Sequence, residues 1–116
     1  MKIQIIAQLD VGVRWDEPAH VYVSYAPALE LYSQGPTEEE ALRAIESAMR
    51  LYLVTAHETN KLDDTLKRRG FVLKRGGLAV ATGIGPESPS QYIKILRDGG
   101  FDRIEPKSIP LELTQV

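Results

Sequence analysis

The sequence predicts an α+β fold in which an antiparallel β-meander carries one long helix on a face. Three strand-like runs in the first 34 residues predict the meander, because they follow one another with short connections. An amphipathic segment from residue 37 to about residue 57 predicts the helix. A chain of 116 residues, with 43% hydrophobic and 26% charged residues, has the size and composition of one such domain.

The meander is predicted from three different local patterns. Residues 2–14 alternate apolar and more polar side chains, as a half-buried strand does. Residues 20–25 are rich in aromatic and β-branched side chains and predict a second strand. After Pro27, residues 29–34 predict a third short strand, which Gly35 and the following proline end.

The long helix has the clearest signal in the sequence. Thr37 is followed three residues later by Glu40, which is the pattern of a capping box. Glu38 and Glu39 place negative charge in the first turn, where the helix dipole favours it. The apolar residues at helical spacing that follow are Ala41, Leu42, Ile45, Ala48, Met49, Tyr52, Leu53 and Ala56.

The patterns that follow the long helix are shorter. Asn60 is expected to cap a second helix, and Gly70 is expected to end it. Residues 71–73 predict a strand. Residues 82–89 contain two glycines, two prolines and one serine, so they predict a loop.

The last part of the chain predicts one more helix and one more strand. A helix is expected to begin at Ser88 or Ser90, and residues 109–116 alternate again as a closing strand. We therefore expect a core over residues 1–75 and a smaller C-terminal extension over residues 76–116, both within the same domain.

The composition excludes several classes of protein. The chain has no cysteine, which excludes disulfides, thiolate metal sites and a cysteine nucleophile. Its N-terminus has no apolar region with a cleavage site, and no stretch approaches the roughly 20 apolar residues of a membrane span. We therefore expect a cytoplasmic protein with no membrane partner.

No catalytic or metal-binding pattern is found in the sequence. His20 and His57 lack the spacing of metal ligands, and no serine lies in a Gly-x-Ser-x-Gly motif. The sequence therefore predicts no enzyme and no cofactor. A small metal-dependent nuclease remains as an alternative, with carboxylates that could be supplied by Asp10, Asp16, Glu30, Glu40 and Asp64.

A basic segment at residues 61–75 is the candidate for nucleic-acid contact, because phosphate binding requires several cations on one face. The alternative is a solvated helix end whose basic residues compensate the helix dipole. The residues of this candidate site are Lys67, Arg68, Arg69, Lys74 and Arg75, with Lys61 nearby.

Three acidic residues of the long helix form a candidate site for a protein partner. Glu38, Glu39 and Glu46 could face a basic protein, since complementary charge favours association. The alternative is a solvated helix face.

The run from residue 21 to residue 42 resembles the HicB antitoxin family. That family has a strand, a Pro-x-Leu bend, a short strand that ends in Ser-Gln-Gly, and Thr-x-x-Glu-Ala at the start of a helix. The matching positions are Pro27, Leu29, Ser33, Gln34, Gly35, Thr37, Glu40, Ala41 and Leu42, and Ala48, Tyr52 and Leu53 continue the match.

The resemblance covers about residues 3–57 and implies a β-β-β-α-β core similar to part of a ribonuclease H fold, without its catalytic carboxylates. It implies a protein that binds and neutralises a small ribonuclease toxin, HicA. Two features depart from the pattern. Leu31 and Tyr32 replace the usual Gly-Cys, as in a solitary subset of the family, and the C-terminal half has no recognisable DNA-binding helix pair.

These observations lead to one expected function and one alternative. We expect a non-catalytic, antitoxin-type binding protein that forms a homodimer or a higher homo-oligomer, since a meander leaves open sheet edges. The alternative is a nucleic-acid-binding regulator that uses the basic segment at residues 61–75.

Overall fold

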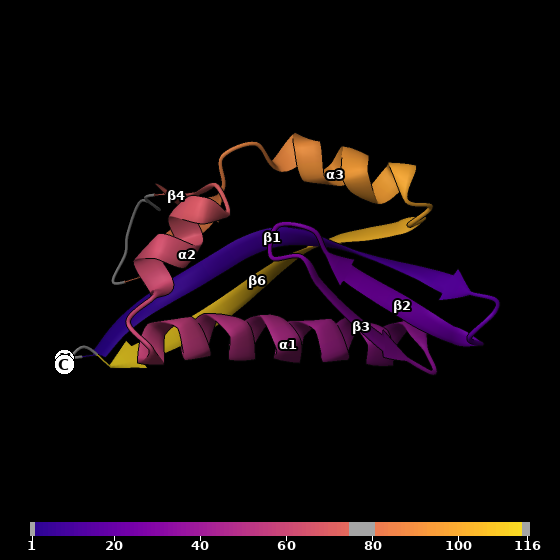
Figure 1. Ribbon diagram of the computed structural model, residues 1–116, viewed down its shortest axis with the longest axis horizontal. Coiled ribbons are helices and arrows are strands. Elements are labelled where there is room, and N and C mark those ends of the chain that lie inside the picture. Colours follow the sequence, from indigo (N-terminus) through magenta and orange to yellow (C-terminus); the bar gives the residue numbers. More distant parts are fainter. Residues whose placement is uncertain (1, 75–80, 115–116) are drawn as a thin grey trace.

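The computed structural model describes residues 2–74 and 81–114 and confirms the α+β fold. The described residues form one sheet of six strands, with three helices packed against it (Figure 1). In chain order the elements are β1 (Lys2–Asp16), β2 (Val21–Ala26), β3 (Leu31–Gly35), α1 (Glu38–Glu58), α2 (Leu62–Arg68), β4 (Phe71–Lys74), β5 (Ala81–Pro86), α3 (Pro89–Asp98) and β6 (Arg103–Thr114).

The long strand β1 organises the sheet. β6 pairs antiparallel with β1 along residues 2–13 and so occupies one edge of it. The other edge is shared, because β5 pairs parallel with residues 4–7 and β2 pairs antiparallel with residues 12–16. β3 then pairs with β2, and β4 pairs with β5. The predicted β1-β2-β3 meander is therefore confirmed, and it forms one end of a larger mixed sheet.

The strand β5 corrects the sequence-based prediction of a loop over residues 82–89. Gly83, Gly85 and Pro86 are turn formers in isolation, which explains the prediction. In the structure the segment pairs with β1 on one side and with β4 on the other, and Ile84 is buried. Tertiary pairing thus overrides the local preference. The closing strand is also longer than predicted, because β6 begins at Arg103.

The connection between β2 and β3 is a buried turn, so β3 begins two residues later than predicted. The N–H of Leu29 donates to the carbonyl of Ala26, and Glu30 has a left-handed φ of 54°. Leu29 is only 1% exposed. The apolar character that suggested a strand at Leu29 therefore reflects burial of the turn in the core.

The helix α1 agrees with the prediction within one residue at each end. The N–H of Glu40 donates to Oγ1 of Thr37 at 3.1 Å, so Thr37 is the N-cap. The apolar face of α1 packs on the sheet face formed by alternate residues of β1. The buried residues of this core include Ala7, Leu9, Val11 and Val13 of β1 and Ala41, Leu42, Ile45, Met49, Leu53 and Ala56 of α1.

The second helix begins differently from the prediction. Asn60 is not its N-cap, because Asn60 has a φ of 58° and its N–H donates to the carbonyl of His57. It ends α1 in the left-handed conformation that favours asparagine. Lys61 precedes α2 and makes no side-chain capping bond. Gly70, with a φ of 73°, follows α2 as predicted.

The third helix covers the opposite face of the sheet from α1 (Figure 1). Its start at Pro89, after Ser88, agrees with the first of the two predicted positions. Leu96 is fully buried against this face. The predicted division at residue 75 lies outside the described residues; on either side of it, β4 and β5 pair with each other.

Candidate interaction surfaces

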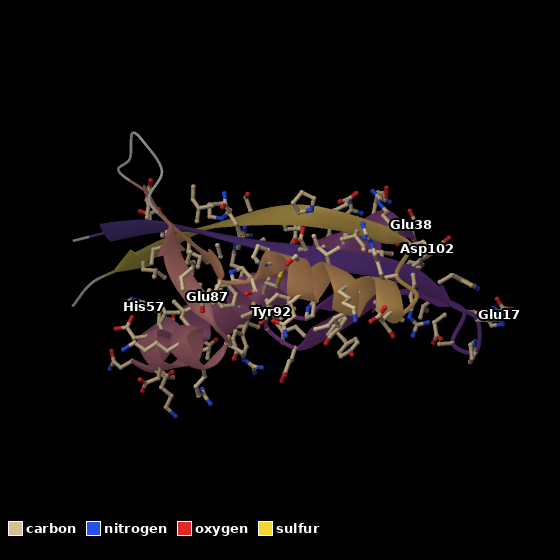
Figure 2. All side chains as sticks on the ribbon, turned by 90° about the horizontal axis from the view of Figure 1, so that it is seen from above. Glu17, Glu38, His57, Glu87, Tyr92 and Asp102 are labelled. Atoms are coloured by element: carbon tan, nitrogen blue, oxygen red, sulfur yellow. The ribbon has the colours of Figure 1, made fainter. Side chains whose placement is uncertain are left out.

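The candidate acidic site on α1 is held in an ion-pair network with β6. Nη1 of Arg103 contacts Oε2 of Glu38 and lies 3.1 Å from Oε1 of Glu39. Nζ of Lys107 lies 3.1 Å from Oε1 of Glu46. Figure 2 shows Glu38 at the same end of the molecule as Asp102, which immediately precedes β6. The three predicted carboxylates thus have partners within the chain and fix α1 to β6.

Glu105 lies between the two cations of this network. Its Oε1 is 2.7 Å from Nη2 of Arg103, and its Oε2 is 3.4 Å from Nζ of Lys107. The hydrogen bond from Arg103 holds the pKa of Glu105 below its ordinary value, against the effect of partial burial. Burial alone would lower the pKa of Lys107, but the contacts with Glu46 and Glu105 outweigh it and raise that pKa. The network therefore favours the charged forms of Glu105 and Lys107.

The candidate basic site is divided between two roles. Lys61, Lys67 and Arg68 line one shallow hollow together with Asp64. Arg69 points elsewhere, because its Nη1 lies 2.7 Å from Oε2 of Glu30. The two exposed cations of α2 are therefore available to a ligand, whereas Arg69 is a structural contact.

Arg69 connects several elements at once. Its Nη2 is 3.5 Å from the hydroxyl of Tyr52 on α1, and its carbonyl accepts a hydrogen bond from the hydroxyl of Tyr92 on α3 at 3.4 Å. The hydrogen bond with Glu30 is the largest of the contacts that raise the pKa of Arg69. Lys74 is the last residue of β4, and Arg75 lies outside the described residues.

The residues considered for metal-dependent catalysis lie apart or already have partners. Asp16 lies 3.8 Å from Arg14, and Glu40 belongs to the cap of α1. His20 packs edge-on against Trp15, and His57 is in the last turn of α1. In residues 2–74 and 81–114, no group of three or more potential ligands is placed to hold a metal ion.

An aromatic row on the sheet face that carries α3 was not predicted from the sequence. Tyr25 and Tyr32 lie directly opposite each other on β2 and β3, and their rings stack at 4.1 Å with an interplanar angle of 9°. Phe101 continues the row at 5.7 Å from Tyr25, and the guanidinium of Arg14 lies 5.4 Å from the centroid of Phe101. We call Tyr32, Tyr25, Phe101 and Arg14 the aromatic row.

The aromatic row combines a buried end with an exposed end. Phe101 is buried, whereas Tyr32 is 64% exposed. Partial burial, and then the hydrogen bond with Tyr32, raise the pKa of Tyr25 to about 12. Tyrosine and arginine are among the residue types that are enriched at protein interfaces. The pairing of Tyr25 with Tyr32 could have been predicted only with the correct length of the turn between their strands.

A comparison of the chain with protein-family models, curated proteins and solved structures finds no match. The resemblance to HicB antitoxins therefore stays a prediction that depends on the residues of the 21–42 run. Within the part of the chain that the structure describes, no helix is long and apolar enough to cross a bilayer.

Proposed function

We propose that this protein is a non-catalytic, HicB-like antitoxin-type binding protein of the cytoplasm, which oligomerises and neutralises a small ribonuclease toxin. One observation carries the proposal. The residues of the 21–42 run occupy one continuous unit of strand, buried turn, strand and capped helix, in the order that the resemblance implies. If these residues matched the HicB pattern only by chance, they would not be expected to fall on the successive elements of such a unit.

Individual positions of that unit have roles that explain their residue types. Leu29 is buried in the turn, and Thr37 caps α1. A β-carbon on Gly35 would lie 2.6 Å from the backbone nitrogen of Ala41, so only glycine allows β3 to approach α1 this closely. These roles support the part of the proposal that concerns the fold of the binding unit.

The mechanism that we propose is coverage of the toxin's active site. A ribonuclease binds a polyanion and is expected to carry a basic active site, which an acidic surface would attract. The α1–β6 network presents such a surface, with four carboxylates (Glu38, Glu39, Glu46, Glu105) against two cations (Arg103, Lys107). A third cation, Arg43, lines one hollow together with members of this network, so the carboxylates still outnumber the cations. Because the ion pairs hold these side chains in place, binding would cost little side-chain entropy.

The test is co-expression with the product of the neighbouring open reading frame, followed by light scattering and titration. We expect a stable hetero-complex. In the variant Glu39→Gln/Glu46→Gln, the dissociation constant should rise about tenfold or more, whereas Glu58→Gln at the other end of α1 should leave it unchanged. The absence of any complex on co-purification and titration would overturn the proposal.

A nucleic-acid-binding regulator is the second candidate, favoured by the hollow that Lys61, Lys67 and Arg68 share. The variant Lys67→Ala/Arg68→Ala should then bind duplex DNA or single-stranded RNA more weakly and with a smaller salt dependence. Arg43→Ala/Arg50→Ala on α1 is the matched control. Equal affinities for the parent and the α2 variant would exclude this function.

A further inference from the structure

In the described residues the sheet has open edges on β3, β4 and β6, and the edges of β3 and β6 differ in character. β6 pairs only with β1 in the described residues, so its outer edge is free. Pro106 and Pro110 lie on that strand, opposite Asp10 and Ile6. They are four residues apart, so their nitrogens face the same side, and in an edge strand that side is the outer one. The outer edge of β6 therefore lacks two of the N–H groups that a further strand would need.

The outer edge of β3 has no such protection. Among the strands of residues 2–74 and 81–114, β3 is the last one at that end of the sheet, and it contains no proline. Tyr32 is its second residue. One ring face of Tyr32 stacks on Tyr25 of β2, so the other ring face points away from β2, toward the position of a further strand. This free ring face is part of a side chain that is 64% exposed.

A strand added to β3 would meet Tyr32 in the same way that β2 does. Residues directly opposite each other on antiparallel strands have β-carbons about 4.5–5.5 Å apart. The side chain that best fits the free ring face is therefore another aromatic ring at the opposite position. A second copy of the chain provides one when its own Tyr32 lies at the two-fold axis.

We infer that the protein forms a symmetric dimer by antiparallel pairing of β3 with β3 of a second copy, in a register centred on Tyr32. The two copies then form a continuous row of four stacked tyrosines, Tyr25 and Tyr32 from each. A two-fold axis at Tyr32 makes the interface self-complementary. This inference rests on the oligomerisation in the proposed function and assigns it to one edge and one register.

The register can be tested directly because the chain has no cysteine. Tyr32→Cys creates a single thiol that lies opposite its own copy, within reach of a disulfide. Gln34→Cys is the matched control on the same strand. In a register centred on residue 32, the two copies of residue 34 lie roughly 14 Å apart along the strands, too far for a disulfide.

We expect rapid oxidation of Tyr32→Cys to a covalent dimer and no such dimer from Gln34→Cys. A register centred on Ser33 would instead link Tyr32→Cys to Gln34→Cys in an equimolar mixture, and that result would overturn the inference. Efficient cross-linking of Gln34→Cys alone would also overturn it.

Sedimentation of the purified full chain over a range of concentrations provides a second measurement. The parent and Tyr32→Phe should be dimers, since both keep the ring. Tyr32→Lys places two like charges opposite each other and should raise the dimer dissociation constant at least about tenfold. Leu51→Ala, which removes an exposed apolar side chain from α1, should leave the dimer intact.

The dimer interface and the antitoxin function can fail independently, because the first is tested by the oligomeric state and the second by binding of the neighbouring gene product. A monomeric parent that still binds the neighbouring gene product would overturn the interface and retain the proposed function. A parent that dimerises through Tyr32 but binds no neighbouring product would retain the interface and overturn the antitoxin function.

Discussion

Gly12 in β1 lies directly against Phe101, the residue that links α3 to β6. A β-carbon on Gly12 would be 2.8 Å from the β-carbon of Phe101 and 2.7 Å from Cδ2 of Leu96. Both distances are shorter than any tolerated contact between carbon atoms. The absence of a side chain at residue 12 is therefore what allows the end of α3 to pack on the sheet beside the aromatic row.

We predict that Gly12→Ala destabilises the protein by about 1–3 kcal/mol, the usual cost of overpacking a well-packed site. Urea denaturation measures the change. Gln8→Ala, an exposed position on the same strand face, is the control and should change stability by less than about 0.5 kcal/mol. Equal stabilities for Gly12→Ala and the parent would show that α3 does not depend on this contact.

The raised pKa of Tyr25 predicts a loss of stability at alkaline pH. Burial, and then the hydrogen bond with the Tyr32 hydroxyl, disfavour the charged form of Tyr25 and raise its pKa in the folded state from the ordinary 10.0 to about 12. Between these values the folded state binds more protons than the unfolded state, so stability falls as the pH rises above 10. The urea midpoint, measured from pH 9 to pH 11, should decrease more in the parent than in Tyr25→Phe.

Removal of the Tyr32 hydroxyl should reverse only part of the rise in the pKa of Tyr25. Tyr32→Phe keeps the stacked ring but removes the hydrogen bond, so the pKa of Tyr25 should fall. It should nevertheless stay above 10.0, because burial is the larger cause. Ultraviolet absorbance of tyrosinate over a pH titration, with Tyr25→Phe to assign the signal, measures the pKa. An unchanged value would mean that the hydroxyl of Tyr32 has no influence.

The ion pairs of Glu105 predict a loss of stability at acid pH. Its pKa is lowered in the folded state by the hydrogen bond from Arg103, so its contribution is complete above the ordinary value of 4.5 and is lost as the pH falls below it. Arg103→Gln should therefore be less stable than the parent at pH 7, by a margin that shrinks below about pH 4. Urea midpoints at low salt measure the margin, with Arg97→Gln as the control. A margin independent of pH would contradict the prediction.

The sequence predicted the elements that local residue patterns determine. The alternation in β1 and the capping box at Thr37 depend on neighbours within a few residues, and both elements were predicted correctly. The strand β5 was missed because Gly83, Gly85 and Pro86 favour turns locally, and only pairing with β1 and β4 makes the segment a strand. Pairing between distant segments has no local signal.

The candidate sites show the same limit. Glu38 was identified as a residue for contact with a partner, but its cation, Arg103, lies 65 residues later in the chain. The aromatic row likewise depends on the four-residue turn that sets Tyr25 opposite Tyr32. The sequence identified residue types suited to binding, whereas the contacts that use them depend on strand register.

The last prediction distinguishes the structural role of Arg69 from the exposed position of Arg68 within the basic segment at residues 61–75. Arg69 joins the buried β2–β3 turn to α1 through Glu30 and Tyr52, whereas the neighbouring Arg68 is exposed beside the hollow. Arg69→Ala should therefore lower the free energy of unfolding by about 1 kcal/mol, the upper part of the range for partly exposed ion pairs. Arg68→Ala should change it by less than about 0.5 kcal/mol. Urea denaturation of both variants measures this. If Arg68→Ala were the more destabilised variant, the structural role would belong to Arg68, and Arg69 would be the residue available to a nucleic acid.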